Sequence, residues 1–169
     1  MPSRQDPVTM DAVYARPGYL FRRMQQIAVA IFMEECKAFD LTPVQYAALV
    51  AIRTHPGIDA TRLSAVIAFD RSTLGSVIER LEGKGHIERK PSPADKRVKL
   101  LYLTRSGAAA LRDIMPSVDR AQARMLQPLK QVDRKALMAL LAQLVDRNNG
   151  ASRVPLRAEE ALEHLGRAN

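Results

Sequence analysis

The chain of 169 residues contains a single cysteine, Cys36. One cysteine excludes an intramolecular disulfide framework and fits a reducing compartment. The sequence also has no apolar run of the roughly 18 to 20 residues that a membrane span needs, and no basic segment followed by an apolar core as in a signal peptide. We therefore expect a cytoplasmic protein without a membrane partner.

The motifs of common enzymes are missing as well. There is no glycine-rich phosphate loop, no G-x-S-x-G elbow and no H-E-x-x-H sequence. The three histidines, His55, His86 and His164, are far apart in the sequence, which argues against a shared metal site. The sequence predicts no catalytic residues, no metal and no cofactor, and a protein that is not an enzyme.

Positive charge is in excess. The chain carries 26 Lys and Arg against 18 Asp and Glu, which gives a formal charge of +8. Polyanions, either nucleic acids or anionic membranes, are the natural electrostatic partners of such a chain, and charge alone does not choose between them. The length corresponds to about one domain, which can bury a sufficient core without crosslinks.

A helix with one apolar and one polar side is predicted from Asp70 onward. Asp70 is a plausible N-cap, and Leu74, Val77, Ile78 and Leu81 recur at three- and four-residue spacing as a buried stripe. Hydroxyl and guanidinium groups near a helix N-terminus suit base edges and phosphates. The candidate DNA-binding residues on the other faces of this helix are Arg71, Ser72, Thr73, Ser76 and Arg80.

A basic hairpin is predicted directly after this helix. Gly85 is expected to end the helix in a left-handed conformation, and residues 87–90 and 98–103 have the composition of strands joined by a proline-rich turn. Lys96 and Arg97 stand at the expected tip, where a protruding positive loop can enter a minor groove. An exposed basic turn by itself is more often only solvated, but the adjoining helix favours DNA binding.

The triplet Asp95-Lys96-Arg97, the strand after it and the run from Leu103 to Gly107, LTRSG, resemble the wing signature of MarR-type winged helix-turn-helix regulators. The resemblance covers roughly residues 17–148. It implies a homodimer on a double-stranded, pseudo-palindromic operator, with the helix from Asp70 in the major groove and Arg97 in the minor groove. The implied fold is mainly α with a small β wing, flanked by N- and C-terminal dimerisation helices.

The rest of the chain is divided around this unit. We expect an extended arm over residues 1–16, a DNA-binding lobe over 41–104, dimerisation helices over 17–39 and 104–149, and a tail over 150–169 that either adds a short helix or stays mobile. Thr42, with Gln45, has the sequence of a capping box. Asp59 and Asp133 are further expected caps, and Pro116 predicts a kink or a break in the helix that Thr104 opens.

The last helix carries an apolar stripe that needs a partner. A single stripe is usually core, but surplus apolar surface on several helices favours a dimer interface. The stripe consists of Leu137, Leu140, Leu141, Leu144 and Val145.

The resemblance also implies an effector. Residues 16–23, RPGYLFRR, are similar to those of relatives that control the catabolism of benzoate-, gentisate- or hydroxynicotinate-like compounds. A small aromatic acid would then release a repressor from its operator, with Arg16 or Arg22 pairing with the carboxylate and Tyr19 and Tyr46 covering the ring. Alternatively, Tyr46 only packs against Leu41.

Two other functions stay open from the sequence. Peroxide-sensing relatives carry a reactive cysteine near the start of the first long helix, whereas Cys36 stands near its end, beside Glu34 and Glu35, whose charge raises a thiol pKa. Inert packing of Cys36 is therefore favoured over redox sensing. A non-specific architectural DNA-binding protein would also be small and basic, and it would differ from a regulator in specificity at raised salt.

Overall fold

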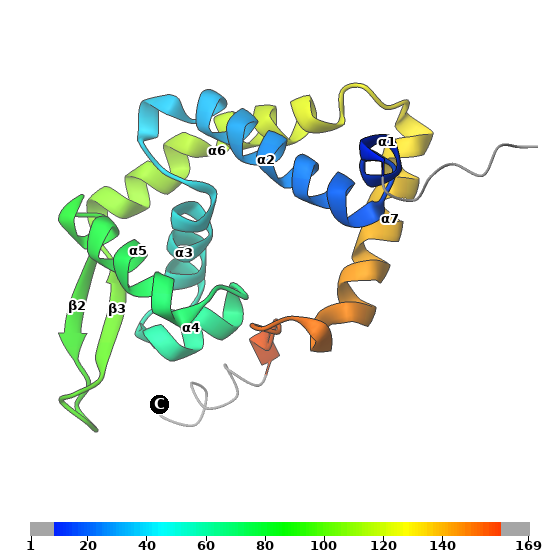
Figure 1. Cartoon of the computed structure of the whole chain (residues 1–169). Coiled ribbons are helices and arrows are strands. Elements are labelled where there is room, and N and C mark those ends of the chain that lie inside the picture. The colour runs from blue at the N-terminus through cyan, green and yellow to red at the C-terminus, as the bar shows by residue number, and fades with distance from the viewer. Residues whose placement is uncertain (1–8, 160–169) are drawn as a thin grey trace, which may run out of the picture.

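The computed structural model describes residues 9–159 and is mainly helical with one small sheet (Figure 1). In chain order, the elements are α1 (Met10–Tyr14), α2 (Pro17–Glu35), η1 (Lys37–Phe39), α3 (Pro43–Thr54), β1 (Ile58–Asp59), α4 (Ala60–Val66), α5 (Arg71–Gly83), β2 (Ile87–Pro91), β3 (Lys99–Leu103), α6 (Arg105–Leu126), α7 (Gln131–Asn148) and η2 (Asn149–Ala151). The predicted fold class, mainly α with a small β wing, is confirmed.

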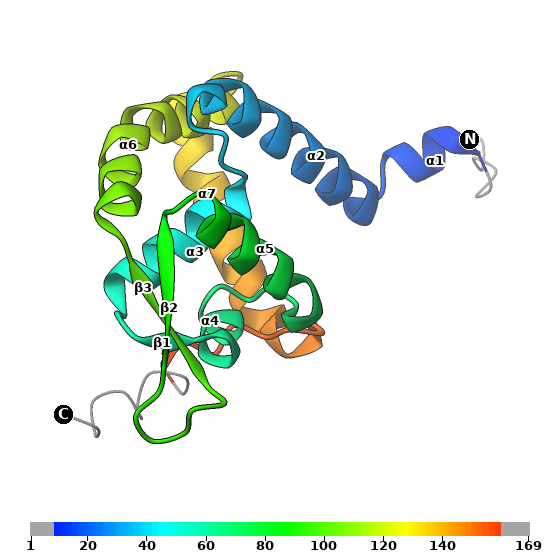
Figure 2. The same cartoon turned by 90° about the vertical axis from the view of Figure 1, so that its left-hand side faces the viewer.

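Two regions of the molecule can be distinguished. α2 and α6 pack together at one end, and α3, α4, α5 and the sheet form a lobe at the other (Figures 1 and 2). The hairpin of β2 and β3 projects from this lobe, and α7 runs from the region of α2 and α6 back toward the level of α4.

The sheet has three antiparallel strands in the order β1-β3-β2. Ile87 pairs with Leu103 and Pro91 with Lys99, while Ile58 of β1 pairs with Leu101. β1 is not predictable from the sequence, because its two residues show no alternation of their own. This strand anchors the base of the wing to the lobe.

One apolar core joins the lobe to the start of α6. Its side chains come from every helix between α2 and α6 and from all three strands, and nine of the largest are at most 2% exposed: Leu49, Ile52, Ile58, Leu63, Leu74, Leu81, Leu101, Leu111 and Ile114. Burial of this kind stabilises a domain without crosslinks. The wing and the helices around it are therefore held as one body.

The helix starts follow the sequence closely. Thr42 accepts from the N–H of Gln45, whose side chain returns a hydrogen bond to the N–H of Thr42, so the capping box is confirmed. Asp59, Asp70 and Thr104 also cap the helices that follow them. These caps fix where the helices of the lobe begin.

The N-terminal predictions need correction. The extended arm is wrong for residues 10–14, which form α1 because Thr9 accepts from the N–H of Ala12 at 3.3 Å. Arg16 is extended because it precedes Pro17, and proline disfavours helical backbone in the residue before it. The single helix expected up to Phe39 ends at Glu35, and a 3-10 turn closes at Asp40 with a left-handed φ of 50°. Residues 1–8 of the arm lie outside the described residues.

Two predictions near the C-terminus need correction. Asp133 is not the cap of the last helix, which starts at Gln131 with Lys130 as its N-cap, so Asp133 lies in the first turn. Of the kink or break expected at Pro116, the break is wrong: α6 is continuous, and Ile114, Ser117 and Val118 around the proline are buried. The kink stays a prediction. Packing on both sides holds the helix where proline removes one backbone donor. The proposed tail helix lies largely beyond Glu159, outside the described residues.

Over residues 9–159, no helix combines the length and apolarity that a bilayer crossing requires. The same residues contain no group of three or more His, Cys, Asp or Glu side chains arranged to hold a metal ion.

Candidate nucleic-acid interface

The helix α5 has the two faces that the sequence predicted. Leu74 and Leu81 are fully buried, and Val77 and Ile78 are at most 6% exposed. The candidate DNA-binding residues of this helix are all exposed: Arg71, Ser72, Thr73, Ser76 and Arg80. The buried stripe therefore fixes α5 on the lobe and turns the polar side chains toward solvent.

Local hydrogen bonds order the start of α5. Asp70 accepts from both the backbone N–H, at 2.8 Å, and the hydroxyl of Ser72. These bonds hold the pKa of the Asp70 carboxyl below its usual value. The hydroxyl of Ser76 donates to the carbonyl of Thr73 at 2.9 Å. Each hydroxyl oxygen keeps its capacity to accept, for example from a base amino group.

The tip of the wing is a hydrogen-bonded turn. Asp95 accepts from the backbone N–H of Arg97 at 2.9 Å, and its carbonyl accepts from Val98 at 2.9 Å. The carboxylate of Asp95 thus contacts the backbone of Arg97. Lys96 and Arg97 are both exposed. The turn thus presents two cations at the end of the hairpin.

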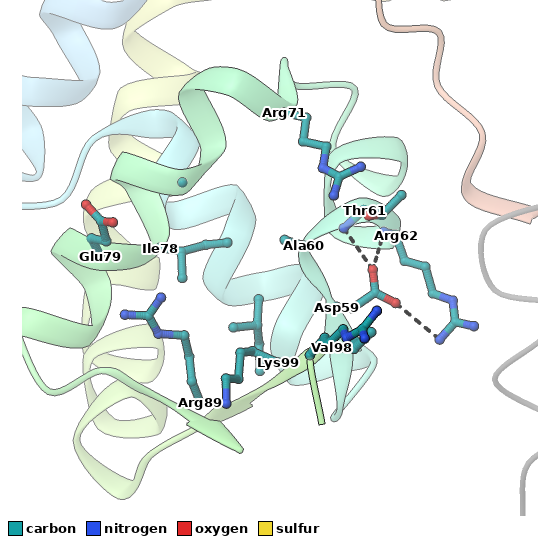
Figure 3. Close-up of a pocket in the computed structure, with 13 residues that line it drawn as sticks. Asp59, Ala60, Thr61, Arg62, Arg71, Ile78, Glu79, Arg89, Val98 and Lys99 are labelled. Atoms are coloured by element: carbon teal, nitrogen blue, oxygen red, sulfur yellow. Dashed lines mark hydrogen bonds and ion pairs between the residues drawn. The ribbon is translucent and has the colours of Figure 1, made fainter. Parts of the chain in front are cut away.

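A hollow of about 510 Å³ lies between α4, α5 and the wing (Figure 3). Its lining includes five cationic side chains, Arg62, Arg71, Arg89, Arg97 and Lys99, and two acidic ones, Asp59 and Glu79. Arg71 and Arg97, both predicted from the sequence, line the same hollow. The lining does not include Ser72, Thr73, Ser76, Arg80 or Lys96.

Arg62 and Arg89 were not among the candidates, yet both line this hollow. Asp59 accepts from the N–H groups of Thr61 and Arg62 as the cap of α4, and it pairs with the Arg62 guanidinium at 3.4 Å. Arg89 pairs with Glu82, and this contact lowers the pKa of Glu82. The sequence contained one signal for the ion pair of Arg62: it stands three residues after the expected cap Asp59, at a spacing that lets the two side chains meet.

The four candidate effector residues fall into two places. Tyr19 packs against Tyr14, with ring centroids 5.0 Å apart, and the Arg22 guanidinium lies 5.0 Å from the Tyr19 ring. Arg16 is the N-cap of the same helix, α2.

Tyr46 lies elsewhere. It packs against Phe32 near the other end of α2, at 6.0 Å between ring centroids, and its hydroxyl contacts the sulfur of Met115 at 3.4 Å. Because Tyr19 and Phe32 are 13 residues apart on one helix, roughly 20 Å separates them at 1.5 Å per residue. One protomer therefore does not bring Tyr46 to the other three residues.

A second, more apolar hollow of about 420 Å³ opens between α3 and α4. It is lined by Tyr46, Ala47, Val50, Ala51, Thr54, His55, Val66 and Ile67. The polar groups of Tyr46, Thr54 and His55 accompany an otherwise aliphatic wall, which is the composition of small-molecule sites. Of these residues, only Tyr46 was predicted from the sequence.

Cys36 is 1% exposed, and its burial and the charge of Glu35 raise the pKa of the thiol. A thiolate is the reactive form of cysteine. The position of Cys36 therefore favours packing over redox chemistry.

A recognition-type helix on a fixed lobe, with a basic wing beside it, defines a winged-helix DNA-binding protein. Comparisons with known proteins agree. The MarR family model matches residues 41–99, which include α3, α4, α5 and the wing up to Lys99. The HTH-type transcriptional repressor NicR of Pseudomonas putida is 30% identical over 134 residues, which cover 79% of this chain and 85% of NicR. The chain belongs to the MarR family of DNA-binding transcriptional regulators.

Solved structures give the same fold. BpsR of Bordetella bronchiseptica, described for the regulation of its DNA binding by 6-hydroxynicotinic acid, is 29% identical with a TM-score of 0.73, over 79% of this chain and 95% of that one. The repressor CouR, bound to a 23-mer DNA duplex, is 28% identical with a TM-score of 0.73, over 83% and 99%. These relatives are regulators of transcription, not enzymes.

Proposed function

We propose that the protein is a homodimeric repressor that binds a pseudo-palindromic operator and is released from it by a small aromatic carboxylate. The observation that carries the DNA-binding part is the set of five cationic side chains that line the hollow between α4, α5 and the wing. Lys and Arg in this number suit a phosphate backbone, and α5 and the wing can enter adjacent grooves. The family membership supports the same function.

Individual residues take distinct roles in this proposal. The exposed residues of α5, from Arg71 to Arg80, enter the major groove, where arginine pairs with guanine and the hydroxyls contact bases or phosphates. Arg97, with Lys96, enters the neighbouring minor groove from the wing tip. Residues 41–104 act as the DNA-binding lobe, and residues 17–39 and 104–149 join two protomers.

Unpaired apolar surface supports the dimer. Large apolar side chains that are 37–70% exposed crowd α2 and α7: Leu20, Phe21, Met24, Ile27, Val29 and Met33 on α2, and Val132, Met138, Leu140, Leu144 and Val145 on α7. A surface of this extent is unusual on a monomer and typical of an interface. Two-fold symmetry then requires inverted half-sites about one DNA turn apart, roughly 10 base pairs.

Footprinting on the DNA upstream of the protein's own gene tests this function. We expect one protected site with inverted half-sites, at salt concentrations where non-specific binding has been lost. Arg97→Ala should weaken binding to this site by about tenfold or more with an unchanged unfolding temperature, because the side chain is exposed. A protein that lost specific and non-specific binding together as salt rises would instead be architectural.

The proposed effector binds in the apolar hollow between α3 and α4. The apolar hollow beside Tyr46 and His55 has room for a single aromatic ring. Arg16, Tyr19 and Arg22 lie at the far end of α2, so we propose that they act on this hollow from the second protomer. Arginine supplies a bidentate partner for the carboxylate, and the tyrosines contact the ring. BpsR, which responds to a hydroxynicotinic acid, makes pyridine and benzene carboxylates the first compounds to test.

Calorimetry with benzoate-, phenol- and pyridine-type carboxylates, in the presence and absence of operator, tests the effector. Linkage requires that the ligand weaken operator binding by the same factor by which operator weakens ligand binding. Arg16→Gln or Arg22→Gln should abolish the response and leave operator affinity without ligand unchanged. Lack of binding by any of these acids, or binding without effect on the operator, contradicts the effector and leaves the DNA-binding function standing.

Redox sensing through Cys36 is not favoured, because the thiol is buried and its pKa is raised.

A further inference from the structure

The residues that follow α7 turn back to the DNA-binding lobe. After η2, the chain passes close to α4 (Figures 1 and 2). The side chain of Asn149 brackets Leu156: its amide donates to the carbonyl of Leu156 at 3.0 Å, and its oxygen accepts from the N–H of Leu156 at 2.8 Å. This pair of bonds closes residues 149–156 into a compact loop, so the segment has a defined course.

The loop is attached to the end of α4 by a backbone hydrogen bond. The last carbonyls of a helix have no partner within it. Here the carbonyl of Leu63 accepts from Ile67, that of Ser64 from Phe69, and that of Ala65 from Arg157 at 3.1 Å. Arg157 thus supplies the donor that α4 lacks. The contact lies beside the turn that leads from α4 to α5.

The side chains of this loop divide by character. Val154 and Pro155 are half-buried, whereas Arg153 and Arg157 are exposed. Between Ala151 and Ala158 these two arginines are the only charged residues. The positive charge of Arg153 also reaches Asp70, the N-cap of α5, where it adds to the effect of the Ser72 hydrogen bonds in lowering the carboxyl pKa. Arg153 therefore brings positive charge to the beginning of α5, and Arg157 is attached nearby, at the end of α4.

We propose that residues 152–157 form a second DNA-contacting segment, in which Arg153 and Arg157 bind backbone phosphates beside the start of α5. This inference rests on the proposed function. The start of a recognition helix is the part that approaches base edges, and phosphates of the same groove lie next to it. Guanidinium groups pair with phosphate oxygens in bidentate geometry. The segment contributes affinity and no base specificity, because phosphates carry no sequence information.

The test uses the full chain with Arg153→Gln, Arg157→Gln and the double variant. Glutamine removes the charge and keeps the backbone N–H that Arg157 donates to Ala65. The control is Lys130→Gln, which removes one exposed charge at the connection between α6 and α7, far from the lobe (Figure 1). Operator affinity is measured across a salt series, with the unfolding temperature of each variant.

Counterion release predicts the size of the effect. Each lost phosphate contact lowers the slope of log K against log salt by about 0.9, which corresponds to about fivefold in affinity at 0.15 M salt. We expect this loss for each arginine variant, about 25-fold for the double variant, and little change for Lys130→Gln. Ethylation interference should identify phosphates whose modification weakens binding of the wild type but not binding of the double variant. All operator sequences should weaken by the same factor.

Other results would overturn the proposal. If the arginine variants keep the salt slope of Lys130→Gln, the segment does not contact DNA. A lower unfolding temperature with weaker binding and an unchanged slope would assign the segment a structural role only. Arg97→Ala separates these outcomes from failure of the proposed function: if it weakens specific binding while the tail variants do not, only the tail contact is wrong.

Discussion

His86 occupies the junction between α5, the wing and α6. Its carbonyl accepts from the N–H of Thr104 at 3.0 Å, and a Cβ at Gly107 would lie 2.1 Å from the same oxygen. Only glycine fits at position 107 without displacing the backbone. The hydroxyl of Thr104 also donates to the carbonyl of Gly85 at 2.6 Å. These three close contacts, two hydrogen bonds and the approach of Gly107 to the His86 carbonyl, fix the angle at which the wing leaves the lobe.

The side chain of His86 makes stability depend on pH. Burial, and then the charge of Lys84, lowers the pKa of His86 below its usual value, and its Nδ1 is buried with no hydrogen-bond partner among residues 9–159. The folded state thus prefers the neutral ring, so its contribution is fully present above the unfolded pKa of about 6.5 and is lost as the pH falls below it.

We predict that the free energy of unfolding decreases between pH 7.5 and pH 5, and that His86→Gln flattens this dependence. Urea unfolding at a series of pH values measures it. His55→Gln, outside the junction, is the control and should keep the wild-type slope. An equal slope in the wild type and His86→Gln would contradict the assignment to His86.

At the scale of elements, α5 depends on one residue for both its start and its geometry. Asp70 caps the helix and also binds the hydroxyl of Ser72. Removal of an N-cap side chain costs about 1 kcal/mol. Without the cap, the first turn of α5 should fray. The residues of this turn are among those proposed to read bases, so the loss of the cap should affect specificity more than total affinity.

We predict that Asp70→Ala lowers the free energy of unfolding by about 1 kcal/mol and reduces the ratio of operator to non-specific affinity. Removal of the carboxylate also removes repulsion from phosphates, so non-specific binding should not fall. Thr42→Ala, which removes the cap of α3, is the matched control: it should cost similar stability and keep the specificity ratio. Equal ratios for both variants would contradict a special role of the α5 start.

At the scale of the whole molecule, the exposed apolar side chains of α2 and α7 need a partner. α7 has no buried residue in one protomer, although the apolar side chains of Leu140 and Leu144, four positions apart, share one side of the helix. A stripe of this kind is covered by a second protomer in the proposed dimer. Two copies then hold two recognition helices at a fixed separation, which a monomer cannot do.

We predict that Leu144→Glu converts the protein to a monomer at micromolar concentration, because a buried unpaired carboxylate opposes association. The affinity of Leu144→Glu for the full operator should be at least 100-fold below that of the wild type. For an isolated half-site, the variant and the wild type should have the same low affinity. Analytical ultracentrifugation gives the mass. Lys135→Glu is the control and should remain dimeric, because Lys135 is exposed and lies nine positions before Leu144, on the opposite side of α7. A wild-type monomer, or a dimeric Leu144→Glu, would refute this interface.

Elements whose signals are local could be predicted from the sequence. The caps at Thr42, Asp59, Asp70 and Thr104 join residues two or three positions apart, and the buried stripe of α5 follows the period of one helix, so spacing alone was sufficient. The left-handed φ of 71° at Gly85 depends equally on a single residue. Weak local signals failed: neither α1 nor the true start of α7 was predicted.

Contacts between residues that are distant in the sequence could not be predicted in the same way. Ile58 pairs with Leu101, 43 positions later, and this pairing makes β1 a strand. The hollow that gathers Arg62 with Arg71 and Arg97, the separation of Tyr46 from Tyr19, and the contact of Arg157 with Ala65 likewise join elements far apart in the chain. Such contacts depend on how helices and strands pack around a shared core, and no periodicity within one element contains that information.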